Sequence, residues 1–491
     1  MNENLITVSD YIKPDVSENA EKYSKEELRI RMEEHRGVEC SSSEKIYIRS
    51  RIFADYILSR RVDLKRLDSN KKYIKNQKTN IYESLSDTIL KRICMEIMDE
   101  LDNELYDHVK EYSLMRYIDT QAKSYHHLNV SDRYVLFPNG IYDFTDMEFH
   151  EKFELDAFVT YMMGFEYDPD AQCPVWLNAL KDMFPDDTEA VLAVVQEMIG
   201  YTFLYDSAPA DTLFLLYGKG RNGKSIFNFV LRKLHGEENV AGIPLNELCS
   251  QFALSAVHGK RVCICPEHSQ EKLLNTATLK ALTGRDAVKV EEKYETPYTA
   301  VFNTKIIINS NHYLRTDDTS VGFWERILPI LFSVTFLHPN EYKEKAESPY
   351  FSERDTHLEE KLEKELPGIF VWAIEGLCRL KKNGYSFSKS QSVINLKNEM
   401  MQYCKPVLAF VIECVRQGNL DKKSGKRDII KSSMLHDRFL AWAEDKTLEV
   451  SGYRNPRVFR KAFLEALQEQ GITAMVRKKS VDYYIGIIVC S

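Results

Sequence analysis

The stretch from Leu213 to Phe227 reads LFLLYGKGRNGKSIF, and the rest of the chain is organised around it. Its apolar first part predicts a buried strand, and the glycines predict a tight turn. Apolar residues at helical spacing then resume from Ile226 to Leu234. The stretch therefore predicts a strand, a loop and a helix in that order, which is the setting of a phosphate-binding loop.

The spacing of glycines and lysine in this loop has a mechanical reason. Residues without bulky side chains let backbone N–H groups surround a phosphate at a helix N-terminus, where the helix dipole favours an anion. Lys224 is predicted to reach the β- and γ-phosphates of ATP, and Ser225 to hold Mg²⁺. The alternative is a chance glycine-rich turn. The predicted nucleotide-binding residues are Gly218, Lys219, Gly220, Arg221, Asn222, Gly223, Lys224 and Ser225.

Two further apolar runs end in polar side chains that suit phosphate chemistry. The run that ends in Pro266-Glu267 predicts a strand beside the first, whose carboxylate would polarise the attacking water and lie on the Mg²⁺ side with Ser225. The run from Lys305 ends at Asn311, whose amide can hydrogen-bond the γ-phosphate or that water. An ordinary glutamate at a strand end is the alternative for Glu267.

Arg326 stands just before another apolar run. A guanidinium can stabilise the charge of phosphoryl transfer, and a neighbouring subunit can supply it. The alternative for Arg326 is a salt bridge with Glu325 or another carboxylate. The predicted catalytic residues are therefore Lys224, Glu267, Asn311 and Arg326.

Length and composition set the limits of this reading. A chain of 491 residues is expected to hold two to four domains, and its net charge of -8 argues against a wholly basic coat for nucleic acid. The ten cysteines contain no C-x-x-C pair, which predicts a reduced, cytoplasmic protein. No apolar run is long enough to cross a membrane, so no membrane association is expected.

The predicted fold class is α/β, with an ATPase core like that of AAA+ proteins built on the phosphate loop. Residues 1–125 are expected to be mostly helical, with helical periodicity around Ile81 to Leu105 and no evident role. Residues 126–205 are predicted to form a collar, with a hairpin turn at Asn139-Gly140. Residues 206–340 form the predicted core, and residues 341–416 a helical lid broken at Pro367.

Residues 417–491 are predicted to hold a charged linker, Gln417 to Lys426, and a winged helix. From residue 417 onward, 14 Lys or Arg stand against 9 Asp or Glu, so basic charge is concentrated here. The second helix of such a domain docks in the major groove of DNA. A winged helix used only for protein contacts is the alternative. The predicted DNA-binding residues are Arg457, Arg460 and Lys461 on that helix and Arg477, Lys478 and Lys479 on the wing.

Taken in chain order, these features resemble a superfamily 3 helicase, and more narrowly the primase-helicases of phages, plasmids and poxviruses. The layout is most similar to the replication initiators of phage satellites and staphylococcal pathogenicity islands. The resemblance covers roughly residues 130 to 490. It is carried by the phosphate loop, Glu267, Leu279–Asp286, Asn311, Trp324-Glu325-Arg326 and the collar pairs Asp168-Pro169 and Cys173-Pro174.

The resemblance implies a homo-oligomeric ring, usually a hexamer, that hydrolyses ATP between subunits and moves 3′ to 5′ along one DNA strand. It also implies a hairpin that grips DNA in the pore, and Ala287 to Val301 fits this hairpin with Lys289, Lys293 and Tyr294. A cation can follow phosphates and an aromatic ring can stack on a base. An exposed surface hairpin is the alternative.

The sequence departs from the family pattern at two positions. Many relatives carry two adjacent acids where this chain has Pro266-Glu267, which leaves the source of a second acid open. Relatives often show two arginines where this chain has Glu325-Arg326, so Arg326 is the one arginine-finger candidate at that position.

The function predicted from the sequence is that of an ATP-dependent replicative DNA helicase and replication initiator of a mobile element in a bacterial cell. It would bind duplex DNA at its origin and single-stranded DNA in its motor, together with host replication proteins. One alternative is a bifunctional primase-helicase. The other is an origin-binding ATP switch that loads a host helicase.

Overall fold

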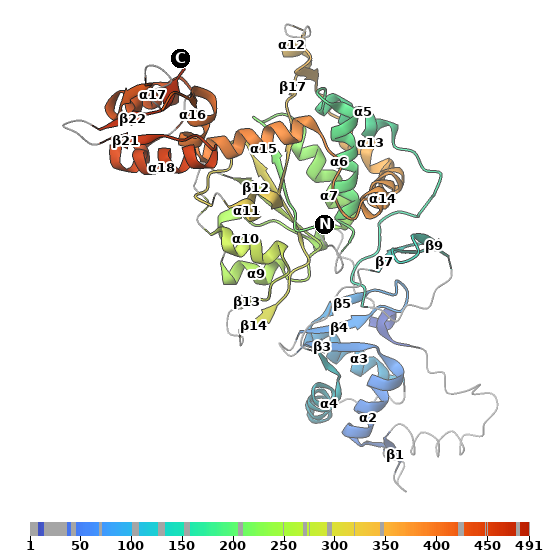
Figure 1. Cartoon of the computed structure of the whole chain (residues 1–491). Helices are drawn as coiled ribbons and strands as arrows, with labels where there is room; N and C mark the ends of the chain where they lie inside the picture. The colour runs from blue at the N-terminus through green and yellow to red at the C-terminus, as the bar shows by residue number, and fades with distance from the viewer. Residues whose placement is uncertain are drawn as a thin grey trace.

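The computed structural model describes residues 8–13, 37–40, 46–67, 71–100, 108–125, 133–151, 158–204, 210–248, 250–268, 273, 275–291, 297–318, 320–343, 348–420, 427–446, 448, 450–477 and 482–490. Figure 1 shows a central α/β body, an N-terminal unit on one side of it and a C-terminal unit on the other. None of the described helices is long and apolar enough to cross a membrane.

The central body is built on a five-stranded parallel sheet in the order β11-β12-β15-β10-β16. β10 therefore lies between β15 and β16, and β12 is one strand further away. The prediction that the strand of Glu267 directly neighbours the first strand was wrong, because β15 occupies that place. The strands are β10 (Leu213–Tyr217), β11 (Val240–Ala241), β12 (Val262–His268), β15 (Lys305–Ser310) and β16 (Ile327–Leu331).

Helices cover both faces of this sheet, because its strands are apolar on both sides. Phe214 and Leu216 of β10 pack on one face against α5 (Pro174–Met183), α6 (Thr188–Tyr201), α7 (Lys224–His235) and α14 (Leu366–Lys382). Leu213 and Leu215 pack on the other. The helices of that second face are α8 (Leu245–Leu248), α9 (Gln251–Val257), α10 (Thr276–Thr283), α11 (Val321–Arg326) and α15 (Gln391–Cys404).

The predicted break near Pro367 is present. α13 (Leu358–Lys364) ends before Glu365, and α14 begins at Leu366 with the proline in its first turn. The carboxylate of Glu365 accepts hydrogen bonds from the backbone N–H groups of Val175 and Trp176, at 3.0 and 2.9 Å. It thereby satisfies the free donors at the start of α5.

In the described part of the N-terminal unit helices hold more residues than strands, but the unit also contains strands that the sequence pattern did not predict. It holds a four-stranded sheet in the order β5-β4-β3-β6 and a separate β1-β2 hairpin. The periodicity from Ile81 joined a strand to a helix, since β5 ends at Leu85 and Ser86 then caps α3. The elements are η1 (Val8–Tyr11), β1 (Val38–Cys40), β2 (Ile46–Ile48), α2 (Ser50–Tyr56), η3 (Ile57–Arg61), β3 (Leu64–Leu67), β4 (Lys72–Lys75), β5 (Tyr82–Leu85), α3 (Asp87–Asp99), α4 (His108–Gln121) and β6 (Ser124–Tyr125).

The predicted turn at Asn139-Gly140 joins β7 (Tyr134–Phe137) to β8 (Gly140–Asp143), and β9 (Glu148–His150) completes this small antiparallel sheet. The side chain of Asn139 exchanges two hydrogen bonds with the backbone of Tyr167, at 2.9 and 3.0 Å. A side chain at position 140 would collide with the carbonyl oxygen of His150, which explains the glycine. The turn and the following segment are therefore fixed together.

The C-terminal unit begins earlier than predicted. α16 (Pro406–Cys414) packs with α17 (Ser432–Asp445) and α18 (Pro456–Glu469) in one apolar core. β19 (Val415–Gln417) pairs with β23 (Ile487–Val489), so Gln417 does not start a separating linker. The boundary lies between α15 and α16. A three-stranded antiparallel sheet completes the unit, made of β20 (Ile429–Lys431), β22 (Tyr483–Ile485) and β21 (Met475–Arg477).

Three small additions complete the central body. The predicted hairpin is present as β13 (Val288–Val290) and β14 (Tyr298–Ala300), at the lower edge of the body in Figure 1. β17 (Thr335–Leu337), α12 (Pro339–Tyr342) and β18 (Phe351–Glu353) form an arm after β16. The short turn η4 (Glu237–Asn239) leads into β11.

Candidate functional site

The glycine-rich loop leaves the carboxyl end of β10 and enters α7, as the sequence predicts. Gly220 and Gly223 have φ angles of +97° and +91°, which glycine adopts without strain. A side chain at Gly218 would collide with the carbonyl oxygen of Phe332, whereas nothing lies within 4 Å of the Cβ position of Gly220. The loop is therefore tightly packed at its start and open at Gly220.

Lys224 is the first residue of α7, and it is 8% exposed. Its Nζ donates a hydrogen bond to Asn311 Oδ1 at 2.7 Å and another to the carbonyl oxygen of Gly218. Burial lowers the pKa of this ammonium group to about 8, and the negative charge of Glu267 opposes the shift. The structure thus holds a desolvated cation against the loop.

Asn311 connects Lys224 to Glu267. Its Nδ2 donates to Glu267 Oε1, while its Oδ1 accepts from Lys224. Glu267 is exposed near the carboxyl end of β12, and Asn311 follows the carboxyl end of β15. The three residues meet because parallel strands end at the same edge of a sheet. We call this set the Lys224–Asn311–Glu267 line.

Two asparagines that the sequence did not single out, the half-buried Asn228 and the buried Asn309, hold the surrounding elements together. Asn228 Nδ2 on α7 donates to Asn309 Oδ1 on β15 at 2.9 Å. Asn309 Nδ2 donates in turn to the carbonyl oxygen of Cys265 on β12, also at 2.9 Å. An amide inside an otherwise apolar strand was the available signal, since a buried amide needs partners.

The other predicted loop residues divide into two groups. Asn222 is buried, and its Nδ2 donates to the carbonyl oxygen of Phe332 at 3.3 Å, so it supports the loop from within. Lys219, Arg221 and Ser225 are exposed. The arm after β16 contacts the loop, because Phe336 N donates to the carbonyl of Arg221 at 2.7 Å and Arg221 lies 3.4 Å from Glu341.

Arg326 does not belong to the Lys224–Asn311–Glu267 line of its own chain. It ends α11 immediately before β16, and Ile327 is level with Leu213 in the parallel register. Gly218 follows the far end of β10, five residues of strand or about 16 Å away. Arg326 Nη2 pairs instead with Asp211 Oδ2 at 3.0 Å, so in the single chain it forms the alternative salt bridge with a carboxylate other than Glu325.

Of the three predicted DNA contacts on the hairpin, the structure describes one. Lys289 is exposed on β13 opposite Thr299, and its Nζ lies 2.5 Å from Glu291 Oε1. Lys293 and Tyr294 lie outside the described residues. The antiparallel strands therefore support a hairpin, and the part of it that was predicted to grip DNA is not described.

On α18, Phe459, Phe463 and Leu467 form the predicted buried stripe. Arg457 and Lys461 are exposed, whereas Arg460 pairs with Asp482 at 2.5 Å and is half-buried. Arg460 thus ties α18 to the residue just before β22. Arg477 is exposed at the end of β21, and Lys478 and Lys479 lie outside the described residues.

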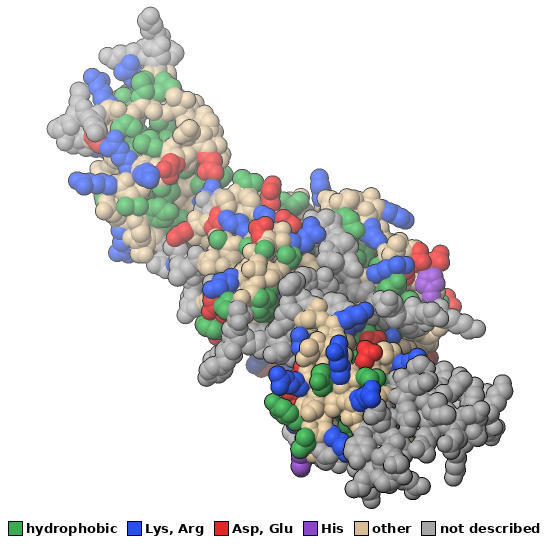
Figure 2. All heavy atoms as spheres, turned by 90° about the horizontal axis from the view of Figure 1, so that it is seen from below, with side chains coloured by type: hydrophobic (Ala, Val, Ile, Leu, Met, Phe, Trp, Pro, Cys, Tyr) green, Lys and Arg blue, Asp and Glu red, His purple; other side chains and the backbone are tan. Residues whose placement is uncertain are grey.

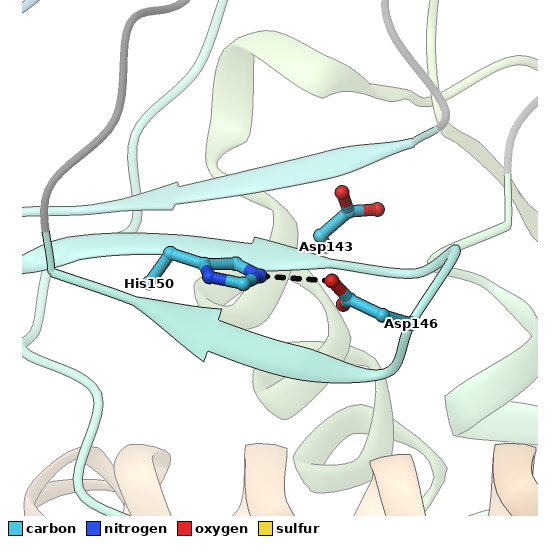
Figure 3. Close-up of side chains that lie close together, drawn as sticks. All are labelled: Asp143, Asp146 and His150. Carbon is cyan, nitrogen blue, oxygen red and sulfur yellow. Dashed lines mark hydrogen bonds and ion pairs between the residues drawn. The ribbon is translucent and has the colours of Figure 1, made fainter.

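A second group of polar side chains lies on the β8–β9 hairpin, where Figure 3 shows Asp143, Asp146 and His150 side by side. Arg133 binds both oxygens of the buried Asp143, and Asp146 lies 3.0 Å from His150 Nε2. Burial alone would raise the pKa of the Asp143 carboxyl, but the Arg133 and Thr145 hydrogen bonds hold it below its usual value. Because arginine already neutralises Asp143, we assign no metal to this group.

Two protein-family models match the chain. One is described as a family of unknown function, DUF5906, and covers residues 216–326, which contain the Lys224–Asn311–Glu267 line. The other is described as D5 N terminal like and covers residues 16–185.

Among solved structures, the A form apo structure of the NrS-1 C terminal region is similar over 89% of this chain and 98% of that chain. The TM-score is 0.49 and the identity 14%. The apo structure of NrS-1 C terminal region (305-718) covers 90% of this chain and 100% of that chain, with a TM-score of 0.47 and 13% identity.

The lowered pKa of Lys224 predicts a pH dependence of stability without nucleotide. Between pH 8 and about 10.4 the folded protein releases this proton while the unfolded chain keeps it, so stability rises with pH in that window. Relative to Lys224→Met, which cannot titrate, we expect wild type to gain about 1.5 kcal/mol between pH 8 and pH 9.5. Urea unfolding at both pH values measures this difference. A constant difference would contradict the burial of a charged lysine.

Proposed function

We propose that this chain is an ATP-dependent DNA helicase of superfamily 3 and the replication initiator of a mobile element. In this proposal it forms a ring, usually of six subunits, that hydrolyses ATP and moves 3′ to 5′ along one DNA strand. The C-terminal unit serves as a winged helix that binds the replication origin.

The observation that carries the proposal is the Lys224–Asn311–Glu267 line beside an open glycine loop. It places a cation, an amide and a carboxylate together where a nucleotide phosphate at the start of α7 would lie. A bound phosphate could replace the Gly218 carbonyl as an acceptor for Lys224 Nζ. The ammonium group would then stay beside the Asn311 amide. The arrangement suits phosphoryl transfer to water, which depends on positioning and charge stabilisation.

Each residue of the line has a distinct role in this reaction. Lys224 binds the β- and γ-phosphates, and contact with these anions favours its charged form. Glu267 accepts a proton from the attacking water, and Asn311 fixes both side chains in place. The exposed oxygens of Ser225 and Glu267 fit Mg²⁺, which when bound supplies charge neutralisation at the phosphates. The source of a second acid beside Pro266 is not assigned.

Arg326 acts, in this proposal, on the nucleotide of the neighbouring subunit. Its place before β16, about 16 Å from its own loop, supports action in trans. Asp211 holds the guanidinium at the opposite edge of the sheet until a neighbour is present. A ring is the closed assembly that head-to-tail contacts of this kind produce.

Two further observations support the DNA-related part of the proposal. The hairpin β13–β14 leaves the same side of the motor as α9 and α10, as Figure 1 shows, and carries the exposed Lys289. The D5 N terminal like match over residues 16–185 agrees with the resemblance to phage and poxvirus primase-helicases. The other proposed DNA contacts are Lys293, Tyr294, Arg457, Lys461, Arg477, Lys478 and Lys479. Arg460 is already paired with Asp482.

Strand displacement tests the proposal directly. Purified protein with ATP and Mg²⁺ is expected to unwind a forked DNA duplex that has a 3′ single-stranded tail, and to fail on a duplex with only a 5′ tail. Fluorescence dequenching of a labelled fork measures the rate. ATP hydrolysis without unwinding of either substrate would contradict the helicase and leave an ATP switch.

A further inference from the structure

The N-terminal unit exposes an unusual set of apolar side chains. Among the residues described from 8 to 248, every exposed large apolar side chain lies on α2 or α4. α2 and α4 pack against each other, so these side chains share one two-helix surface. They are Ile52 (39% exposed), Val109 (77%), Tyr112 (69%) and Tyr117 (40%).

The outward position of these rings follows from the pattern of α4. Leu114, Met115 and Ile118 are buried in the core of the unit and define the inner side of the helix. Tyr112 and Arg116 are one turn apart, so they are neighbours on its outer side. The tyrosines are therefore presented to solvent by a helix whose inner face is already satisfied.

The charges of the unit leave this surface positive. Four of its acids are paired with basic side chains, since the buried Lys72 binds Asp87 and Asp119, Lys91 binds Glu111, and the buried Arg61 binds Glu100.

Arg51, Arg60 and Arg116 are exposed and form no ion pair within the part of the chain that the structure describes. Asp55, on α2 between Arg51 and Arg60 in the sequence, is exposed and opposes their positive charge. Figure 2, seen from below, shows Lys and Arg side chains gathered with hydrophobic ones over the N-terminal unit.

We infer that the α2–α4 surface, defined by Arg51, Ile52, Tyr112, Arg116 and Tyr117 together with Arg60 on the adjoining η3, binds single-stranded nucleic acid. Arginines without an ion pair among the described residues match the charge of a phosphate backbone, and phosphates that bind them release counterions. Exposed tyrosine rings offer stacking platforms for unpaired bases, whose faces a duplex hides. This inference concerns the N-terminal unit, which has no role in the proposed function, and it does not depend on the proposed ATPase.

Photocrosslinking of the full chain locates the contact. A thymidine-rich single strand that carries 5-iododeoxyuridine is irradiated with the protein without nucleotide, and the linked peptides are identified by mass spectrometry. We expect links to Tyr112 or Tyr117, because a stacked base lies against the ring. Links confined to the hairpin and the C-terminal unit would overturn the inference.

Substitutions then distinguish stacking from general apolar docking. The double variant Tyr112→Leu and Tyr117→Leu keeps apolar area but removes both rings, and we expect its affinity for the strand to fall at least 10-fold by fluorescence anisotropy. The triple variant Arg51→Ala, Arg60→Ala and Arg116→Ala is expected to lower the slope of log affinity against log salt by about 2. Asp55→Ala removes the opposing charge and is expected to raise the affinity.

All of these residues are exposed, so circular dichroism is expected to show wild-type folding in each variant. Wild-type affinity and salt slope in the tyrosine and arginine variants would overturn the inference. If the variants bind the strand normally but break up the oligomer in mass photometry, a second copy of the chain occupies the surface and the inference is wrong. If Tyr112→Leu no longer crosslinks to the strand while its oligomers stay intact, the result supports the inference.

Discussion

Replacing Lys224 with alanine is expected to lower the rate of ATP hydrolysis by roughly 10²–10³-fold or more. The buried ammonium is the one cation of the Lys224–Asn311–Glu267 line, and it lies against both the loop carbonyl of Gly218 and the amide of Asn311. Without it, the phosphates and Glu267 lose the buried cation that lies closest to them in this line. Release of phosphate under saturating ATP measures the effect.

The loss is expected without unfolding, because the lysine is held at a cost when no nucleotide is bound. Its lowered pKa shows that the folded protein disfavours the charge. The midpoint temperature of thermal unfolding of Lys224→Ala should therefore equal or exceed that of wild type. A suitable control is Lys233→Ala on the same helix, because that lysine pairs on the surface with Glu363 at 2.6 Å and faces away from the loop. Full hydrolysis by Lys224→Ala would contradict the phosphate loop.

The edge of the sheet could be predicted from the sequence because its logic is local. One short stretch of sequence forms a strand, a glycine loop and a helix. Parallel pairing then brings the polar residues that follow the other strands to the same edge of the sheet. The strand order is a different matter. Nothing in the apolar runs of β12 and β15 tells which of them pairs with β10, which is why the predicted pairing of β12 with β10 was wrong.

The two ends of the chain were predicted less well for a physical reason. The strand β4 contains Lys72, which is buried only because Asp87 and Asp119 reach it from two helices. From the sequence alone this segment is charged and lacks the apolar pattern of a buried strand, so the strand was not predicted. α16 is apolar on nearly every side, so its sequence fits a lid as well as the C-terminal core that it joins. In both cases the partner, and not the segment, decides the structure.

Replacing Arg326 with alanine is expected to lower ATP hydrolysis by about 10³-fold or more, although this residue is remote from the loop of its own chain. Arg326 is paired with Asp211 in the single chain. In a ring, the nucleotide phosphates of a neighbour would compete with Asp211 for the guanidinium. The variant is therefore expected to bind ATP and assemble normally while failing in hydrolysis, which a nucleotide-binding assay and mass photometry measure beside the phosphate release.

Mixing two inactive proteins separates action in trans from action in cis. Glu267→Gln lacks the base of its own site, and Arg326→Ala lacks the arginine that it would offer to a neighbour. In mixed rings, an Arg326→Ala site that faces a Glu267→Gln neighbour has both an intact carboxylate and an intact arginine, so hydrolysis should reappear in proportion to such joints. Arg232→Ala, which breaks a surface pair with Glu237, is the matched control and should stay active alone. Absence of recovery in assembled mixed rings would mean that Arg326 serves its own chain through Asp211, as a structural ion pair.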